Sequence, residues 1–391
     1  MTTDNNRIVW LDWLRVTACL MVMTVHATEP FYIGGEGAQI LTAADAFWAS
    51  LSDSFVRACV PLFIIASSYL LFPVGVTTRE FFGRRLSRLL VPFVVWSLAY
   101  ALAWGEPVAN LQALLLNFNY AAGHLWFVYM LLGVYLLMPM LSPWAERVGR
   151  RELQGYLCVW CLTLFIPFVR EAASGGTPLV MHGPTGIPNA AAYPLWGEAS
   201  WNGYGLFYYV SGFIGYLLLG LYFRRFVPEL SWRRTLAIAV PSWLAGFWVC
   251  FEGFFSRVFD MGLDFPIAGP VDWVVGWETP WYNDTIGVAL MTVGWVLFFR
   301  KLNVPATATR VRAALTTVSK ASYGMYLCHM FVLAAASGFF RSTLGTAGEG
   351  CLGIWTTPVE ILLTALTTFA VTAVVCSLLQ RIPYLGKWIV G

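Results

Sequence analysis

Four ionisable residues near the start of the chain are spaced so that they can act together. Arg15 and His26 are eleven residues apart, close to three helical turns, so both would lie on one helix face, about 16 Å apart. Asp12 lies three residues before Arg15, and Glu29 lies three residues after His26, a spacing that permits side-chain contact. Histidine exchanges protons near neutral pH, and a neighbouring carboxylate can orient it. The pattern indicates a fixed cation, a titratable base and a carboxylate along one stripe.

The residues between Arg15 and His26 are almost wholly apolar, so this stripe would lie within a membrane span. Ionisable side chains in a hydrocarbon layer are costly unless they are paired or near water, which makes each one a functional candidate. Two simpler interpretations stay open at this point. Arg15 could anchor the inner interface by pairing with Asp12, and His26 could be a buried histidine hydrogen-bonded to a neighbouring span.

The other histidines add to this candidate site. The chain has four histidines, and His182, in a predicted outer loop, is expected to be solvated. His124 opens a predicted span in "GHLWFV", together with Trp126. His329 lies near the middle of another span, three residues after Tyr326, so the two side chains share one helix face. Three of the four histidines therefore fall at membrane depth or at its edge.

A cluster of arginines precedes another predicted span in "FFGRRLSRLLVP". It contains Arg84, Arg85 and Arg88, of which Arg85 and Arg88 share a helix face. The planar guanidinium group binds phosphate through two parallel hydrogen bonds, so the cluster suits a phosphate-bearing ligand. The alternative is the ordinary positive charge of a cytoplasmic loop.

Composition assigns these residues to a membrane protein. Of the 391 residues, 58% are hydrophobic and 12% are charged, whereas a soluble domain averages about 25% charged residues. The chain has no phosphate-binding loop, dinucleotide fingerprint or metal-ligand spacing. The sequence therefore predicts an integral membrane protein with no nucleic-acid partner and no metal.

Apolar runs of about 20 residues are expected to span the bilayer. Ten such runs are found, at residues 11–31, 53–73, 86–104, 124–142, 154–169, 203–223, 235–254, 283–299, 321–340 and 357–379. With a cytoplasmic N-terminus, this layout puts all but four of the 24 basic residues on the inner side, the exceptions being Arg57, Arg170, Arg257 and Arg341. We therefore predict an all-α polytopic protein of the bacterial inner membrane, with both termini cytoplasmic.

One transmembrane domain over residues 1–391 is predicted, with longer outer connections at about 170–202 and 255–282. These connections are rich in tryptophan. Such residues are usually interfacial anchors, and the alternative is a platform on which sugar rings stack. The residues concerned are Trp196, Trp201, Trp273, Trp277 and Trp281.

Several motifs together resemble the membrane acyltransferase-3 family of bacterial integral-membrane O-acyltransferases. They are "LDWLRVTACLMVMTVH", "VPLFIIASSYLLF", "RRLSRLLVP", "GHLWFV" and "SYGMYLCH", in the same order and spacing as in that family. The sequence departs from the family in one place, because Ser67-Ser68-Tyr69 stands where Ser-Gly-Tyr is usual. We expect Ser68 to tighten or polarise a close helix contact at this position.

The resemblance implies transfer of an acyl group, usually acetyl, from cytoplasmic acyl-coenzyme A to a hydroxyl group of a glycan, lipid-linked sugar or small molecule. It implies a catalytic role for His26 and Arg15. The chemistry of the stripe makes His26 a general base or a transient acyl carrier, and the spacing of Glu29 alone predicts that it orients His26. The resemblance also implies coenzyme binding by Arg85 and Arg88, to which we add Arg84, Tyr326 and His329. His124 and Trp126 are the predicted substrate-binding residues.

The expected acceptor is cellulose or another exopolysaccharide, with a lipid-linked sugar as the next choice. Association with machinery for polysaccharide synthesis or export is also expected. Two other classes of function stay open. One is a sugar or lipid transporter with His26 and Glu29 as a proton relay, although the inverted repeat typical of transporters is not found. The other is a non-catalytic membrane subunit of a polysaccharide synthase.

Overall fold

The computed structural model describes residues 7–391, except residues 36, 117–119, 174–203, 306, 346–349 and 384. His182, Trp196 and Trp201 lie outside the described residues. Within them, eight helical segments are long and apolar enough to cross a membrane. Five of these are single long helices, namely α1 (Val9–Thr28), α4 (Thr78–Ala103), α6 (Trp126–Arg147), α10 (Trp232–Phe259) and α13 (Thr309–Leu344). The all-α polytopic fold is therefore confirmed.

The other crossings combine shorter elements. Two of them join consecutive helices, α2 (Ala43–Val56) with α3 (Cys59–Leu71) and α7 (Arg150–Thr163) with α8 (Ile166–Ala173), and a third joins the 3₁₀ turn η6 (Gly353–Trp355) to α14 (Thr356–Leu379). A ninth is bent by 43°, where α11 (Val271–Glu278) and η5 (Thr279–Trp281) meet α12 (Ile286–Phe299). The sequence therefore locates these apolar segments but not the breaks inside them.

The predicted span at 203–223 differs from the expectation. Its helix, α9 (Ile214–Arg225), has 12 residues and follows the 3₁₀ segment η4 (Gly205–Val210). Gly212 between them has φ +68°, a left-handed conformation that glycine adopts without steric cost and that ends a helix. Hydrophobicity marks this segment as membrane-buried, but the break leaves a helix of about 18 Å at 1.5 Å per residue, too short to cross alone.

Short elements complete the described fold. They are η2 (Glu29–Phe31), α5 (Pro107–Leu116), η3 (Tyr120–Leu125) and α15 (Leu385–Ile389). A small antiparallel sheet in the order β1-β2-β3 joins β1 (Ile33–Gly34) and β2 (Gly37–Ile40) to β3 (Ile267–Gly269). This sheet ties the connection after α1 to the one between α10 and α11. It thereby fixes the C-terminal end of α1 beside α11.

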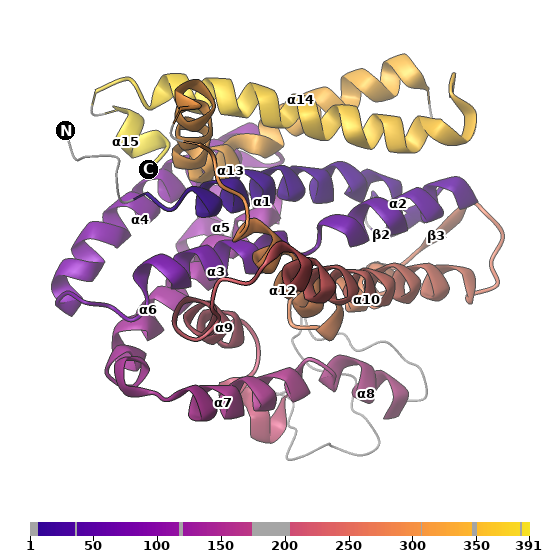
Figure 1. Cartoon of the computed structure of the whole chain (residues 1–391). Coiled ribbons are helices and arrows are strands. Elements are labelled where there is room, and N and C mark those ends of the chain that lie inside the picture. Colours follow the sequence, from indigo (N-terminus) through magenta and orange to yellow (C-terminus); the bar gives the residue numbers. More distant parts are fainter. Residues whose placement is uncertain are drawn as a thin grey trace.

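Helix α1 lies inside the bundle. It packs against α2, α3, α12, α13 and α14, and its neighbours on both sides are visible in Figure 1. Leu14, Ala18, Cys19 and Met23 are completely buried. The ionisable stripe of this helix is therefore surrounded by protein, which is where polar groups in a membrane are tolerated.

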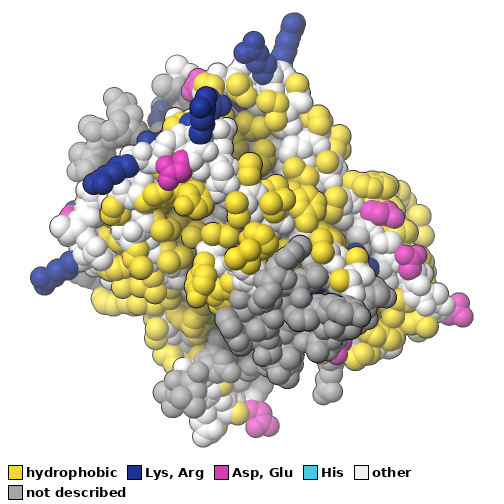
Figure 2. All heavy atoms as spheres, turned by 90° about the horizontal axis from the view of Figure 1, so that it is seen from below, with side chains coloured by type: hydrophobic (Ala, Val, Ile, Leu, Met, Phe, Trp, Pro, Cys, Tyr) yellow, Lys and Arg dark blue, Asp and Glu magenta, His cyan; other side chains and the backbone are white. Residues whose placement is uncertain are grey.

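Charge is distributed unevenly over the surface. On the face shown in Figure 2, Lys and Arg side chains gather towards the left and top, with a few Asp and Glu side chains among them, while the charged side chains on the right-hand side are mainly Asp and Glu. Hydrophobic side chains occupy most of the area between them. The start of α1 and helix α15 lie together at one end of the molecule (Figure 1). An excess of Lys and Arg towards one end of the molecule is the pattern that the positive-inside rule describes for the cytoplasmic side.

The tryptophans before α12 have a different role from the one expected. Trp281 is 1% exposed and stacks on Phe254, with ring centroids 3.9 Å apart. Its indole N–H donates to Ser54 Oγ at 2.8 Å. Trp277 is also buried, at 3% exposure. The prediction of an interfacial anchor is wrong for these two residues, because α11 and η5 pack against α10 and enclose them.

Candidate active site

Two cavities lie against each other inside the bundle. We call the larger one, of about 560 Å³, the histidine cavity because His26 lines it. The smaller one, of about 300 Å³, is the arginine cavity, and Arg15 lines it. Phe63, Phe127 and Tyr326 line both. Their rings form a common wall, with centroids 5.9 Å apart for the phenylalanine pair and 5.3 Å apart for Phe127 and Tyr326.

His26 and Glu29 are in contact, as their spacing predicts. Nδ1 of His26, in the last turn of α1, lies 2.8 Å from Oε1 of Glu29 in η2. An ionised carboxylate can only accept, so Nδ1 carries the proton in this pair. In the neutral imidazole Nε2 then bears the lone pair, which is the state that either a general base or a nucleophile requires. Both residues line the histidine cavity.

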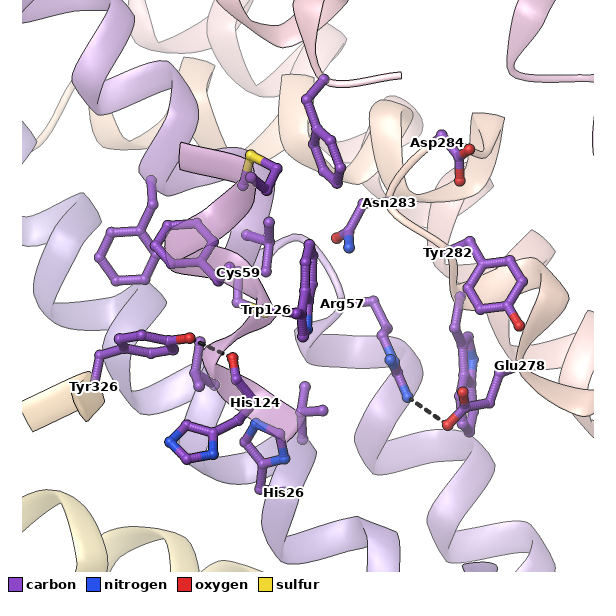
Figure 3. Close-up of a pocket in the computed structure, with 18 of the residues that line it drawn as sticks. His26, Arg57, Cys59, His124, Trp126, Glu278, Tyr282, Asn283, Asp284 and Tyr326 are labelled. Atoms are coloured by element: carbon purple, nitrogen blue, oxygen red, sulfur yellow. Dashed lines mark hydrogen bonds and ion pairs between the residues drawn. The ribbon is translucent and has the colours of Figure 1, made fainter. Parts of the chain in front are cut away.

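Three histidines from separate parts of the chain meet here. The ring centroid of His26 lies 5.1 Å from that of His329 and 6.1 Å from that of His124. Figure 3 shows His26 and His124 side by side at the cavity wall. His329 is completely buried, and its Nδ1 donates to the Tyr326 carbonyl oxygen at 2.6 Å. Within the described residues, no group of His, Cys, Asp or Glu side chains has the arrangement of a metal site.

Two buried imidazole nitrogens in this cluster have no hydrogen-bond partner in the described part of the chain. They are Nε2 of His124 and Nε2 of His329. A buried polar atom without a partner is unfavourable, and in an active site it marks a position that a ligand or water can fill. His124 lines the histidine cavity, whereas His329 lies behind His26 as a packing neighbour.

The arginine cavity brings together basic side chains from three helices. Its cationic lining residues are Arg15 of α1, Arg85 and Arg88 of α4, and Lys320 of α13. None of the side chains lining it is acidic. Such a cavity attracts a polyanion, and arginine binds phosphate oxygens in pairs.

Arg84 is set apart from Arg85 and Arg88. It is 68% exposed, forms an ion pair with Glu80 and lines neither cavity.

Asp12 differs from the simpler interpretation of the sequence, in which it pairs with Arg15. Its carboxylate accepts from Arg7 at 2.6 Å and from Ser319 at 2.6 Å. Arg15, for its part, lines the arginine cavity.

Tyrosines of α13 hold the common wall in place. The Tyr326 hydroxyl donates to the carbonyl oxygen of His124 (Figure 3). The Tyr323 hydroxyl donates to the Leu89 carbonyl oxygen at 2.7 Å. These bonds tie α13 to η3 and to α4 across the two cavities. The polar stripe of α13 therefore runs from the arginine cavity to the histidine cluster.

A charged cluster that the sequence did not reveal forms the opposite side of the histidine cavity. Arg57 donates to Asp53 at 2.7 Å, lies 3.7 Å from Glu278, and its guanidinium lies 4.5 Å from the ring centroid of Trp281. The Tyr32 hydroxyl donates to Glu278 at 2.7 Å. Figure 3 shows Arg57 and Glu278 facing each other at the cavity.

One signal for this cluster was present in the sequence. Arg57 is among the four basic residues that fall on the acidic side of the charge distribution, and Asp53 lies four residues before it, within helical contact. Glu278 could not be found in this way. It reaches the cavity because α11 is held there by long-range packing and by the pairing of β2 with β3.

Ser68 closes the contact between α3 and α9. It is completely buried, and its hydroxyl donates to the Leu217 carbonyl oxygen at 2.6 Å. Gly220 lies directly against it, since a Cβ atom built there would come within 2.6 Å of Ser68. The serine therefore polarises a close helix contact, as expected, and a glycine across the interface provides the space.

Comparison with known protein families matches residues 8–377 to the acyltransferase-3 family, described as "Acyltransferase domain". The match covers nearly the whole chain, from the start of the first helix to the end of the last long one. No curated protein and no solved structure matches the chain.

Proposed function

Because the chain belongs to the acyltransferase-3 family, we propose that it transfers an acetyl group from acetyl-coenzyme A to a hydroxyl group of a carbohydrate. The acceptor is an extracytoplasmic polysaccharide, such as cellulose or another exopolysaccharide, or a lipid-linked sugar. The site of action is the bacterial inner membrane. The membrane acyltransferase assignment follows from the family and the helices, and the donor and acceptor are the proposal.

The observation that carries the proposal is the pair of cavities with a common wall. The arginine cavity is lined by four cationic side chains, which suits the phosphates of coenzyme A. The histidine cavity holds a histidine oriented by a carboxylate. Phe63, Phe127 and Tyr326 are the apolar boundary between them. A long, thin pantetheine arm that passes this boundary would present its thioester to His26.

The proposed reaction is an acyl transfer with His26 as the proton carrier. The acceptor hydroxyl oxygen attacks the thioester carbonyl carbon while Nε2 of His26 takes its proton. The tetrahedral intermediate collapses, the carbon–sulfur bond breaks, and His26 returns the proton to the thiolate of coenzyme A. Glu29 holds the imidazole through Nδ1 and balances its charge when it is protonated.

The same lone pair of His26 also suits a two-step route. In that route Nε2 attacks the thioester, the carbon–sulfur bond breaks and coenzyme A leaves as the thiolate. The acceptor hydroxyl oxygen then attacks the acyl-imidazolium, the carbon–nitrogen bond breaks, and the hydroxyl proton passes to the thiolate. The two routes differ in one observable species. Mass spectrometry of the protein, quenched in acid after mixing with acetyl-coenzyme A alone, detects an acetylated His26 only in the second.

The proposal is tested with purified protein, radiolabelled acetyl-coenzyme A and a cello-oligosaccharide acceptor. We expect label in the oligosaccharide, a loss of roughly 10²–10⁴-fold in the His26→Ala variant, and a smaller loss in Glu29→Gln. Both variants should still bind acetyl-coenzyme A, since neither residue lines the arginine cavity. A wild-type protein that neither binds nor cleaves the thioester, or full activity in His26→Ala, would sink the enzyme proposal.

A further inference from the structure

The two cavities carry opposite charge. Every ionisable side chain that lines the arginine cavity, tyrosines apart, is cationic. The histidine cavity is lined by one arginine, Arg57, and by three carboxyl side chains, those of Glu29, Glu278 and Asp284. The excess of carboxyl groups lies on the side where, by the proposed function, the acceptor binds.

Arg57 offsets at most one of these charges, because Asp53 and Glu278 share it. Asp53 is completely buried and accepts from Arg57 at 2.7 Å, and Glu278 lies 3.7 Å from the same guanidinium group at the cavity. Glu29 is balanced by His26 whenever the imidazole is protonated. Counting Asp53, Glu278 and Asp284 against the single charge of Arg57 leaves an excess of carboxyl groups on this side of the cavity. Tyrosine hydroxyls hold two of these carboxylates in place, that of Tyr32 for Glu278 and that of Tyr204 for Asp284.

A second, independent observation points to a hydroxyl-bearing ligand. His124 is 7% exposed, lines the histidine cavity, and has an Nε2 atom without a partner in the described residues. The side chain of Asn283 projects into the same space from the corner between α11 and α12 (Figure 3). An amide both donates and accepts, and a sugar hydroxyl does the same, so the two match. Trp126, at 38% exposure, offers an aromatic surface beside them.

From these observations we infer that the histidine cavity selects neutral or amino-bearing sugars as acceptors and rejects sugar acids. The inference rests on the proposed function and specifies the acceptor. Carboxylates accept hydrogen bonds from hydroxyl groups and from ammonium groups. A carboxylate on the sugar would instead face Glu278 and Asp284 in an enclosed space, where repulsion between like charges is poorly screened.

The cavity volume fits this acceptor. About 560 Å³ lies within the range of pockets that enclose a small ligand, roughly 300–1,000 Å³. The volume is therefore large enough for a sugar ring beside the reacting hydroxyl group. The same charge also keeps the donor in its own cavity, because the phosphates of coenzyme A are repelled from the acceptor side.

The experiment measures binding and transfer separately for three tetrasaccharides, a neutral cello-oligosaccharide, an amino-bearing chitosan oligosaccharide and an oligogalacturonate. Binding to purified protein is followed by tryptophan fluorescence without any acyl donor. We expect the neutral and amino-bearing probes to bind at least about tenfold more tightly than the oligogalacturonate. Transfer from radiolabelled acetyl-coenzyme A should follow the same order.

Variants then assign the selection to the two carboxylates. Glu278→Gln and Asp284→Asn should each raise the affinity for oligogalacturonate and lower the preference for the amino-bearing probe. Asp284→Asn keeps the test valid if the loss of the bond from Tyr32 prevents Glu278→Gln from folding. The matched control is Asp272→Asn, the same loss of charge at an exposed position in the first turn of α11 that lines neither cavity.

The outcomes separate this inference from the proposed function. Equal or tighter binding of oligogalacturonate, no binding of any probe, or an equal effect of Asp272→Asn would overturn the charge selection. If binding follows the expected order but no probe is acetylated, the selection stands and the proposed transfer fails. If all three probes are acetylated equally well, the transfer stands and the selection fails.

Discussion

Arg85 and Arg88 show at the level of single residues how helix geometry separates neighbouring side chains. Arg84 and Arg85 are adjacent in sequence, but only Arg85 and Arg88 line the arginine cavity. Successive residues of a helix differ by about 100° in direction, so adjacent arginines point to different surroundings. Arg84 is exposed and paired with Glu80 instead.

The first prediction concerns Arg88. By the proposed function, replacing it with alanine would remove a charge-assisted contact to the coenzyme phosphates, and such a contact is worth roughly 1.5–3 kcal/mol. We expect Arg88→Ala to raise KM for acetyl-coenzyme A at least about tenfold while kcat changes less. Arg79→Ala serves as control, because Arg79 is exposed on the same helix and lines neither cavity. An unchanged KM in Arg88→Ala would contradict a donor site in the arginine cavity.

At the level of elements, close packing of α3 on α9 positions one side of the bundle. The contact depends on a serine in α3 and a glycine in α9, residues 68 and 220, which lie directly against each other. Small residues at helix interfaces let backbones approach closely, which is a main source of association between helices in membranes. The serine that departs from the family pattern thus has a partner that accommodates it.

The second prediction tests this contact. Gly220→Ala should lower the free energy of unfolding by roughly 1–3 kcal/mol, because the added methyl group overlaps Ser68. The double variant Gly220→Ala with Ser68→Gly should recover most of the loss. Thermal unfolding in detergent measures both. Gly133→Ala on α6 is the control, since no atom lies within 4 Å of a Cβ built there. Equal stability of the single and double variants would refute the proposed contact.

For the whole molecule, the charge separation predicts how the chain lies in the membrane. Basic residues gather at the end that holds the arginine cavity, and acidic residues line the histidine cavity. If the basic end is cytoplasmic, coenzyme A enters from the side where it is made. The acceptor then enters from the opposite side. An orientation with the basic end in the cytoplasm therefore agrees with the proposed ligands of both cavities.

The third prediction is this orientation. Single cysteines at exposed Arg151 and Asp272, introduced after the exposed Cys158 and Cys351 are replaced by serine, report the two sides of the membrane. In intact spheroplasts, an impermeant maleimide should label position 272 and should label position 151 only after permeabilisation. Labelling of both positions from the same side would exclude this layout.

The sequence by itself determined the features that lie within one helix or in the overall composition. The stripe from Arg15 to His26, the contact of His26 with Glu29, and the separation of charge could all be predicted. Helical periodicity, hydrophobicity and the positive-inside rule act over short distances along the chain, so they can be read from the order of residues. The resemblance to the acyltransferase-3 family added the prediction of acyl-transfer chemistry.

The tertiary structure alone decided the features that join distant segments. Glu278 reaches Arg57 from more than 200 positions along the chain, Trp281 becomes a core residue, and Phe63, Phe127 and Tyr326 become one wall. Hydrophobicity shows that such residues will be buried but does not select their partners. That choice depends on which helix faces pack together, and it is made by steric fit and pairing between elements far apart in sequence.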